Sequence, residues 1–254
     1  MRNRIFSVDD NPKASKVSEY GWINAIHYMA PASLSGYNMC AMSTPDCEKI
    51  CIGWHTGQAS MVARESDMNN VRSSRIQKAR RYMESREEYM GDVCRSIELL
   101  QAVARRAGKQ LCIRLNGSTD IPFERVPVTY HGMRHANIML AFPSVQFDDY
   151  TKLHNRFDRE LPPNYYLVYS RAEGRSDIAL RLLSRGVSVA IVSRRHRPKR
   201  GELLRQWCGF KAVNGDAHDL IHLWPRGSVI ALSPKGPKAK RLAHAADDGE
   251  GFVL

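Results

Sequence analysis

Apolar residues recur with two different periods along the chain, and the period changes near Gly108. Upstream of it, apolar side chains return every three or four positions, which is the spacing of one face of a helix. These side chains are Tyr89, Val93, Ile97, Leu100 and Ala104. Two arginines stand shortly before Gly108, as is typical of a helix C-terminus. The pattern predicts that residues 60–107 are helical.

Downstream of Gly108, short apolar runs end at turn residues, the pattern of buried β-strands. Strands are expected at 110–116, 145–150, 165–170, 187–193 and 228–233. Helices are expected between them, near 133–142, 175–185 and 200–208. Strands alternating with helices imply right-handed βαβ units and a parallel sheet. The expected fold class is α/β, a complete or partial TIM-like barrel of parallel strands with alternating helices; an open doubly wound sheet is the alternative.

The order of these segments predicts a single structural domain with two appendages. Residues 1–59 are expected to form an N-terminal arm and a cysteine-rich loop, and 60–233 the barrel-like domain. Residues 234–254 form a tail that is basic and then acidic. No apolar run reaches the roughly 18 residues of a membrane helix, and no apolar run follows the basic N-terminus as in a signal peptide. A cytoplasmic location without membrane contact is therefore expected.

Cys40, Cys47 and Cys51 lie within twelve residues, in a C-x6-C-x3-C pattern. In a reducing cytoplasm, thiols grouped in this way are typical of ligands for a soft metal. They suit three irons of a four-iron cluster, whose fourth iron stays open to a substrate or to S-adenosylmethionine. Alternatively, His55 follows Cys51 by four residues and completes a Cys3His zinc site. Both metal sites agree with the donor types.

Polar residues gather where the predicted strands give way to loops, the edge at which α/β folds build their sites. Carboxylates there position a base or ribose hydroxyls, and cations bind phosphate or carboxylate groups. The candidates for catalysis are Asp120, Asp148 and Lys152. The candidates for binding a cofactor are Asn116, Gly117, Ser170 and Arg171. Gly117 is among them because a glycine lets the backbone approach a ligand closely.

The 254-residue chain carries a formal net charge of +12. A field of this sign attracts polyanions such as nucleic acid or anionic cofactors. The densest basic segment lies between 193 and 200, and its candidate phosphate contacts are Arg194, Arg195, Lys199 and Arg200. No Gly-x-Gly-x-x-Gly follows a strand, and neither a P-loop nor a Gly-x-Ser-x-Gly motif occurs. These absences argue against a Rossmann dinucleotide site, a P-loop nucleotide site and a serine hydrolase.

Three segments carry a resemblance to a family of phage-encoded proteins: 33–40 running into the cysteines, 114–122 and 142–152, with 214–219 as a weaker fourth. Such proteins in turn resemble radical S-adenosylmethionine enzymes, which have a three-cysteine loop followed by the βα units of a partial barrel. The usual cysteine spacing in that superfamily is C-x3-C-x2-C, and this chain differs from it. The resemblance implies residence in the host cytoplasm.

Two functions follow as hypotheses. The first is an iron–sulfur phage enzyme of radical S-adenosylmethionine type that acts on a nucleotide or a nucleic acid, with Cys40, Cys47 and Cys51 holding the cluster. In such an enzyme the cofactor carries the radical chemistry and the protein orients the substrate. The alternative is a non-enzymatic phage accessory protein that binds nucleic acid and contains a structural zinc ion.

Overall fold

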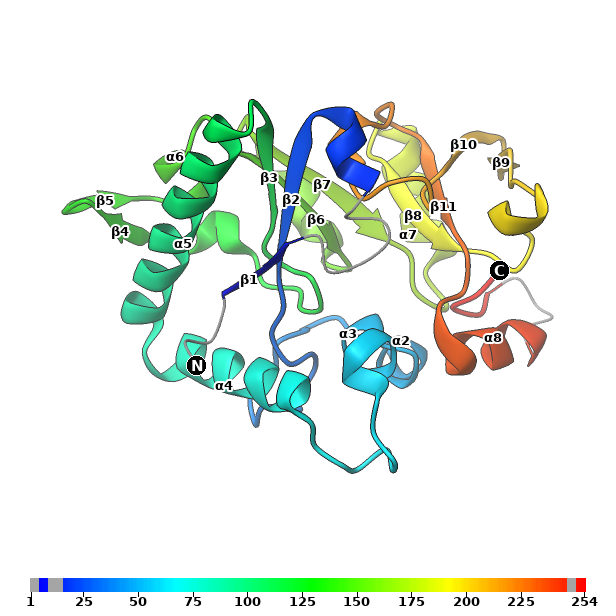
Figure 1. Cartoon of the computed structure of the whole chain (residues 1–254). Helices are drawn as coiled ribbons and strands as arrows, with labels where there is room; N and C mark the ends of the chain where they lie inside the picture. The colour runs from blue at the N-terminus through cyan, green and yellow to red at the C-terminus, as the bar shows by residue number, and fades with distance from the viewer. Residues whose placement is uncertain (1–4, 9–15, 246–249) are drawn as a thin grey trace.

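The computed structural model describes residues 5–8, 16–245 and 250–254, and a nine-stranded sheet forms its centre (Figure 1). In spatial order the strands are β1 (Phe6–Val8), β2 (Trp22–His27), β3 (Gln110–Arg114), β6 (Gln146–Thr151), β7 (Tyr165–Ser170), β8 (Val189–Val192), β11 (Val229–Leu232), β10 (Phe210–Asn214) and β9 (Gln206–Trp207). The edge strands β1 and β9 pair antiparallel with their neighbours, and every pair between them is parallel.

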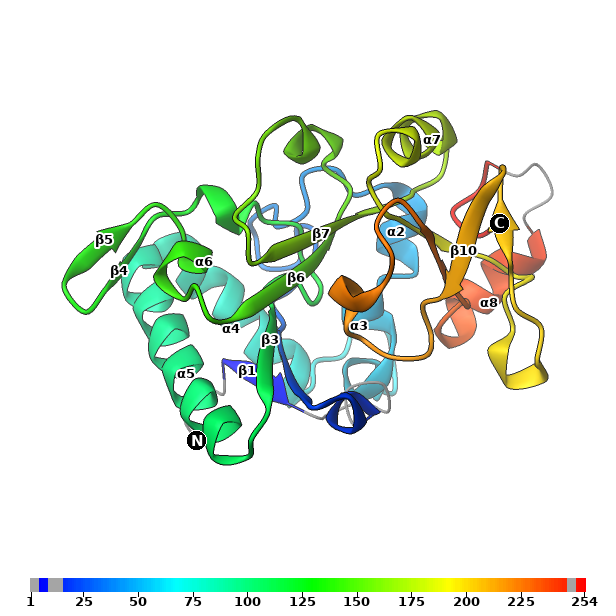
Figure 2. The same cartoon turned by 90° about the horizontal axis from the view of Figure 1, so that it is seen from above.

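From β2 to β8 the strands of this sheet follow one another in space as they do along the chain, as in a barrel, whereas β10 and β9 lie beyond β11, the strand that follows them in the chain. Within the described residues, however, the two edge strands do not pair with each other, so the sheet stays open. A mixed α/β fold around a large, mostly parallel sheet is therefore confirmed, whereas a closed TIM-like barrel is not formed by the described part of the chain. Seen from above, the sheet is curved, with α5 and α7 on its outer side (Figure 2).

The helices differ greatly in length. They are α2 (Pro45–Lys49), α3 (Ile52–His55), α4 (Asn70–Glu84), α5 (Arg86–Arg106), α6 (Ile138–Ala141), α7 (Ser176–Ser184) and α8 (Gly236–Ala245). The predicted helical segment 60–107 is thus two helices, and α4 begins only at residue 70, where the Asn69 side chain accepts a hydrogen bond from the Arg72 amide at 2.9 Å. No helix among the described residues is long and apolar enough to cross a membrane.

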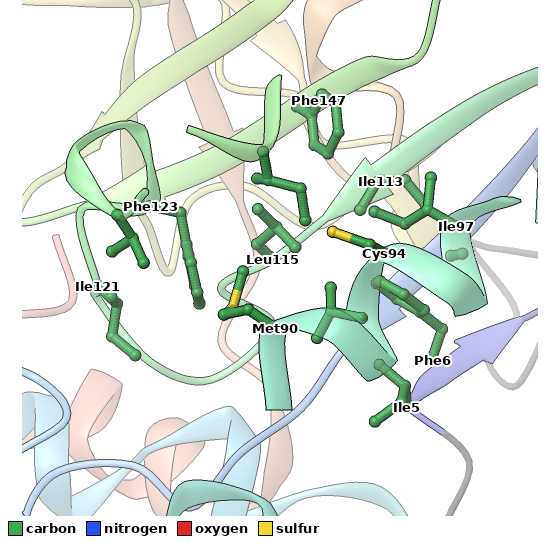
Figure 3. Close-up of a cluster of buried hydrophobic side chains, with 14 of the residues drawn as sticks. Ile5, Phe6, Met90, Cys94, Ile97, Ile113, Leu115, Ile121, Phe123 and Phe147 are labelled. Atoms are coloured by element: carbon green, nitrogen blue, oxygen red, sulfur yellow. The ribbon is translucent and has the colours of Figure 1, made fainter. Parts of the chain in front are cut away.

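Helix α5 packs on the sheet through the face that the periodicity predicts. Its buried residues are Tyr89, Met90, Val93, Cys94, Ile97 and Ala104. Figure 3 shows Met90, Cys94 and Ile97 close to Ile113 and Leu115 in the largest apolar cluster of the protein. Burial of these side chains is the main favourable term that holds the helix on the strand.

Two predicted helices are wrong or shortened. The segment 200–208 contains strand β9 instead of a helix, because Gly201 and Gly209 adopt positive φ angles that turn the chain on both sides of it. In the segment 133–142 only α6 is helical. The first residues of this segment form β5 (Met133–His135), which pairs with β4 (Val128–Tyr130) in a hairpin. Between β6 and β7 the chain makes a 3₁₀ helix, His154–Asp158, where a βαβ unit would have a full helix.

Both predicted appendages contribute to the central fold. Segment 1–59 contains β2, a strand inside the sheet, while the arm residues 1–4 and 9–15 lie outside the described residues. Segment 234–254 contains α8, and Val253 is buried and bridges to Val192 at the end of β8. Residues 246–249 of the tail lie outside the described residues.

The two faces of the sheet differ in polarity. Alternate residues point to opposite faces of a strand, and the face under α5 carries Ile113 and Phe147. The opposite face, here called the polar face, carries Asn24, Cys112, Arg114, Asp148 and Tyr150. The connection between β10 and β11 covers part of the polar face, because the amide of Ile221 donates to the Asp148 carboxylate at 3.3 Å.

Candidate functional site

A cavity of about 2700 Å³ lies at the carboxyl ends of the parallel strands. Each of these strands, from β2 to β10, contributes a residue at or just past its end. In spatial order they are Tyr28, Asn116, Lys152, Ser170, Arg194, Ser233 and Asp216. The location is the one at which open α/β sheets and barrels bind ligands. Helices α2, α3 and α8 stand below the strand ends in Figure 1, and residues from all three also line the cavity.

Cys40, Cys47 and Cys51 all line this cavity. The loop that follows β2 carries Cys40, helix α2 carries Cys47, and Cys51 precedes α3. Cys40 Sγ accepts a hydrogen bond from the Ala32 amide at 3.3 Å. The loop is anchored by the segment that follows β7, because Glu173 accepts hydrogen bonds from Thr44 Oγ1 at 2.7 Å and from the Asp46 amide at 2.9 Å.

The thiols of the cysteine loop are close enough to influence one another. The pKa of Cys40 is raised to about 12, mainly by burial and to a smaller extent by the neighbouring Cys51 and Cys47. Burial and Cys47 likewise raise the pKa of Cys51 to about 11, while Lys152 and Arg75 act in the opposite direction. Both thiols therefore keep their protons at neutral pH until a cation binds them.

The distances between the sulfur atoms bear on the type of metal. A single zinc ion with Zn–S bonds of about 2.3 Å brings its thiolate sulfurs to within roughly 4 Å of one another. In the described residues, one group of three or more metal-donor atoms lies within 4.8 Å of one another, and it is Cys112, Asp148 and His222, not the cysteine loop. The three loop sulfurs are thus spread more widely than one zinc ion requires.

His55 lies at the end of α3 and also lines the cavity. Its Nδ1 is 3.6 Å from a carboxylate oxygen of Glu65. Partial burial and the nearby Lys238 lower the pKa of His55, so the imidazole is neutral at pH 7 and has a nitrogen available as a donor to a metal.

Asp120 is held by hydrogen bonds at both carboxylate oxygens. Oδ1 accepts from Thr151 Oγ1 at 2.7 Å and lies 3.2 Å from Arg156 Nη1, while Oδ2 accepts from the Lys152 amide at 2.7 Å. The carboxylate therefore joins the loop after β3 to the end of β6. This arrangement makes Asp120 a structural part of the cavity wall.

Asn116 and Gly117 shape the same wall. The Asn116 side chain donates to Ile121 O at 2.9 Å and to Asp149 Oδ2 at 3.1 Å, and so closes the loop on itself. A Cβ at Gly117 would lie 2.6 Å from the Ile26 side chain and 2.7 Å from His27 O. Gly117 is therefore required by the close approach of β2, whether or not a ligand is bound.

Lys152 and Ser170 are the strand-end pair inside the cavity. Lys152 Nζ donates to Ser170 Oγ at 3.0 Å and lies 5.1 Å from the centre of the Phe252 ring. Lys152 is 9% exposed, so its ammonium group acts in a region of reduced dielectric next to Cys51. This cation is positioned to stabilise negative charge on the sulfur or on a bound ligand.

Asp148 and Arg171 lie outside the cavity lining. Asp148 is fully buried in the middle of β6, on the polar face, 3.1 Å from Arg114 and 3.3 Å from His222 Nδ1. Arg171 is 2% exposed and donates to Gly251 O at 2.7 Å, which fastens the C-terminal segment beside the end of β7. In this arrangement both side chains make internal contacts.

Arg194, Arg195, Lys199 and Arg200 are exposed and line the cavity along one side. Their segment is ordered by a buried histidine: His196 is 0% exposed, and its ring accepts from the Leu204 amide at 3.3 Å and bonds Asn214 Oδ1 at 3.0 Å. The basic segment expected to contact phosphates therefore stands over the same cavity as the cysteines.

Several residues of the cavity were not among the site residues expected from the sequence. Arg75 and Lys78 come from α4, Tyr28 directly follows β2, and Arg114 and Tyr150 lie in β3 and β6. The guanidinium of Arg114 lies 5.2 Å from the centre of the Tyr150 ring, and that of Arg75 lies 4.7 Å from the Tyr28 ring. One signal for Arg114 is available in the sequence, since an arginine within an apolar strand must have a polar partner.

The chain is similar to one described protein family over nearly its whole length. The family model with the description Gene product 88 matches residues 4–250. No curated protein and no solved structure matches the chain. The match spans the cysteine loop, all strands of the sheet and the basic segment.

Proposed function

This chain belongs to the Gene product 88 family of phage proteins, and we propose that it is an iron–sulfur enzyme of radical S-adenosylmethionine type that acts on a nucleotide or a nucleic acid. One observation carries the proposal: Cys40, Cys47 and Cys51 share a cavity with Lys152 and Ser170 at the carboxyl ends of neighbouring parallel strands. Thiolates beside strand ends with polar side chains suit a metal cofactor and an organic ligand bound next to each other.

The donor set supports a cluster more than a single ion. A four-iron cluster spreads its thiolate ligands over separate iron atoms and so holds them further apart than one zinc ion does. The loop sulfurs are not among the donor groups that lie within 4.8 Å of one another. Three cysteines also leave one iron of such a cluster without a protein ligand, which is the position that an S-adenosylmethionine would take.

The residues around the cysteines have defined tasks in this proposal. When bound, the cluster and S-adenosylmethionine supply one-electron chemistry that no side chain here can provide. Lys152 and Arg75 offset the negative charge of the thiolates, in keeping with their effect on the pKa of Cys51. Ser170 orients the Lys152 ammonium group, and Asp120 fixes the backbone of Lys152.

Anaerobic reconstitution with iron and sulfide tests this function. We expect a broad visible absorption band, about four irons per chain, and loss of both in the single variants Cys40→Ser, Cys47→Ser and Cys51→Ser. Cys208→Ser is the matched control, since Cys208 is exposed and outside the cavity lining. Stoichiometric zinc in protein purified without oxygen, with no absorption band after reconstitution, would rule the proposal out.

A second function is a non-enzymatic nucleic-acid-binding phage protein with a structural zinc ion. It is favoured by His55, a neutral imidazole that lines the same cavity as the three cysteines. This alternative expects zinc bound by the cysteines and His55, and a lower melting temperature on chelation. His55→Ala separates the two functions, because it should release zinc in the second and leave iron content unchanged in the first.

A further inference from the structure

We propose that the cavity receives a single-stranded nucleic acid, with the phosphates along the basic segment 194–200 and a base inside, on the ring of Tyr28 or Tyr150. The inference rests on the proposed function in one respect, since it names the substrate class of the same site. It narrows the substrate from any nucleotide or nucleic acid to a single strand. This strand would contact both the basic segment, here called the rim, and the interior of the cavity.

The size of the cavity is the first observation. Sites for small molecules and cofactors usually have volumes of about 300–1,000 Å³, whereas this cavity has about 2700 Å³. After one organic cofactor is accommodated, more than half of the space remains. A single mononucleotide would leave much of it unfilled, but a few nucleotides of a strand would not.

The second observation is unpaired positive charge on one rim. Arg195, Lys199 and Arg200 are exposed, and none of them has an ion-pair partner among the described residues. By contrast, Arg197 between them pairs with Glu202 at 2.9 Å and holds the segment in a bridged loop. Exposed cations on an ordered loop, without carboxylates to neutralise them, are the kind of contact that a phosphate backbone uses.

The third observation is that aromatic rings and guanidinium groups line the interior of the cavity. Tyr28 and Tyr150 are half-buried and line the cavity, and each ring is paired with a guanidinium, Arg75 at 4.7 Å and Arg114 at 5.2 Å. Aromatic rings and guanidinium planes are the surfaces on which unpaired bases stack. In the basic segment itself aromatic residues are absent, so the fold supplies the stacking surface from other strands.

A single strand fits these features better than a duplex. Stacking on Tyr28 or Tyr150 requires a base that is free of its partner and can leave the rim for the interior. A duplex would keep its bases stacked on one another and would contact only the rim cations. The cavity also places such a base in the same space as Cys40, Cys47 and Cys51, where the proposed cofactor would be.

Fluorescence anisotropy with labelled oligonucleotides of 20 nucleotides tests the inference on the full chain. The probes are single-stranded DNA, single-stranded RNA and a blunt DNA duplex, with adenosine monophosphate as a competitor. We expect at least tenfold tighter binding of one of the single strands than of the duplex, and no competition by the mononucleotide at matched nucleotide concentration. Equal or tighter binding of the duplex, or full competition by the mononucleotide, would overturn the inference.

Charge variants test the rim. The triple variant Arg195→Glu, Lys199→Glu, Arg200→Glu should bind the strand at least tenfold more weakly. Its log–log salt dependence should be less steep by about 2, since each single-strand phosphate contact contributes about 0.7. The matched control changes three exposed arginines outside the cavity, Arg106, Arg134 and Arg159, to glutamate. If both triple variants bind the strand equally weakly, binding depends on the net charge of the protein and not on the rim, and the inference is overturned.

Ring variants test the interior. Tyr28→Ala and Tyr150→Ala remove the two rings on which a base would stack. We expect at least one of these variants to bind the strand about tenfold more weakly or worse, and Tyr28→Phe and Tyr150→Phe to bind it as tightly as the parent protein. Unchanged binding in both Ala variants contradicts the inference. The measurements are repeated on a Cys40→Ser, Cys47→Ser, Cys51→Ser variant, which has no cluster. If the triple cysteine variant binds the strand and the parent protein takes up no iron, the proposed function fails and this inference stands. If the parent protein takes up iron but neither protein prefers the strand, this inference fails and the proposed function stands.

Discussion

Lys152 Nζ donates a hydrogen bond of 3.0 Å to Ser170 Oγ and thereby joins the ends of β6 and β7 inside the cavity. The two strands are parallel neighbours in register from Phe147 to Thr151, so their ends arrive at the same height. The ammonium group lowers the pKa of Cys51, against the larger effect of burial. Lys152 is thus the cation that connects the strand ends to the cysteine loop.

The first prediction concerns this cation. Lys152→Met keeps the length of the side chain but removes its charge, and we expect at most half of the iron of the parent protein after anaerobic reconstitution. Ser170→Ala keeps the charge and should lose much less iron. Iron and sulfide are measured per chain, with circular dichroism to verify the fold. Full iron content in Lys152→Met would show that the cysteines ionise without help from this cation.

The second prediction concerns Asp120 as a structural residue. Asp120→Ala leaves the Lys152 amide, the Thr151 hydroxyl and one side of Arg156 without an acceptor. Unpaired buried donors each cost about 1–3 kcal/mol, and Arg156 keeps Glu124 as a second partner at 2.7 Å. We expect the free energy of unfolding in urea to fall by about 2–4 kcal/mol. A variant as stable as the parent protein but inactive would instead make Asp120 a catalytic group.

Much of the parallel sheet could be predicted from the sequence, because its strands are short apolar runs bounded by turns. Strand β7 occupies 165–170 as expected, and α5 buries the predicted face. Strand β2 was not predicted, since Trp22–His27 is buried on both faces and shows no alternation of polar and apolar residues. Strand β10 was not predicted either, because Lys211 and Asn214 leave no continuous apolar run in Phe210–Asn214.

Parts of the site could be predicted only from the position of strand ends. That rule indicated Lys152 and Ser170, which line the cavity with the cysteines. Asp148 lies three residues before Thr151, the last residue of β6, and its side chain is buried on the polar face under Ile221 instead of lining the cavity. Arg75 joins the cavity from a helix that lies between β2 and β3 in the chain, a contact that depends on tertiary packing and leaves no local pattern.

The third prediction uses two glycines with opposite surroundings. Gly117→Ala would place a Cβ 2.6 Å from the Ile26 side chain and 2.7 Å from His27 O, so β2 and β3 would have to move apart. We expect a loss of at least about 2 kcal/mol in the free energy of unfolding, from overpacking in the core. Gly91→Ala is the control, since it lies in α5 with 3.5 Å to the Arg95 side chain. It should gain up to about 1 kcal/mol from helix propensity.

Urea denaturation of both glycine variants provides the measurement. Equal stability of Gly117→Ala and the parent protein would mean that the loop after β3 shifts without cost. The proposed close approach of the two strands would then be wrong.

The fourth prediction concerns the pH dependence of stability at His27. This side chain is 1% exposed; its Nδ1 bonds Leu115 O at 3.0 Å and must donate, so Nε2 accepts from the Tyr89 hydroxyl at 2.6 Å. Burial, with a smaller effect of Lys78, lowers the pKa of His27 to about 3. Below pH 6.5 the unfolded chain therefore binds a proton at His27 that the folded protein does not bind.

The sign of the effect follows from this difference in bound protons. Between pH 6.5 and about 3, His27 should lower the free energy of unfolding by about 1.4 kcal/mol for each unit by which the pH falls, and above pH 6.5 it should have no effect. His27→Gln cannot be protonated, so its urea-denaturation free energy should fall less steeply than that of the parent protein between pH 6.5 and 4.5. The exposed His154→Gln variant is the control. If His27→Gln and the parent protein have equal slopes, a proton enters the folded core at His27, and the Tyr89 hydroxyl cannot be donating to a neutral ring.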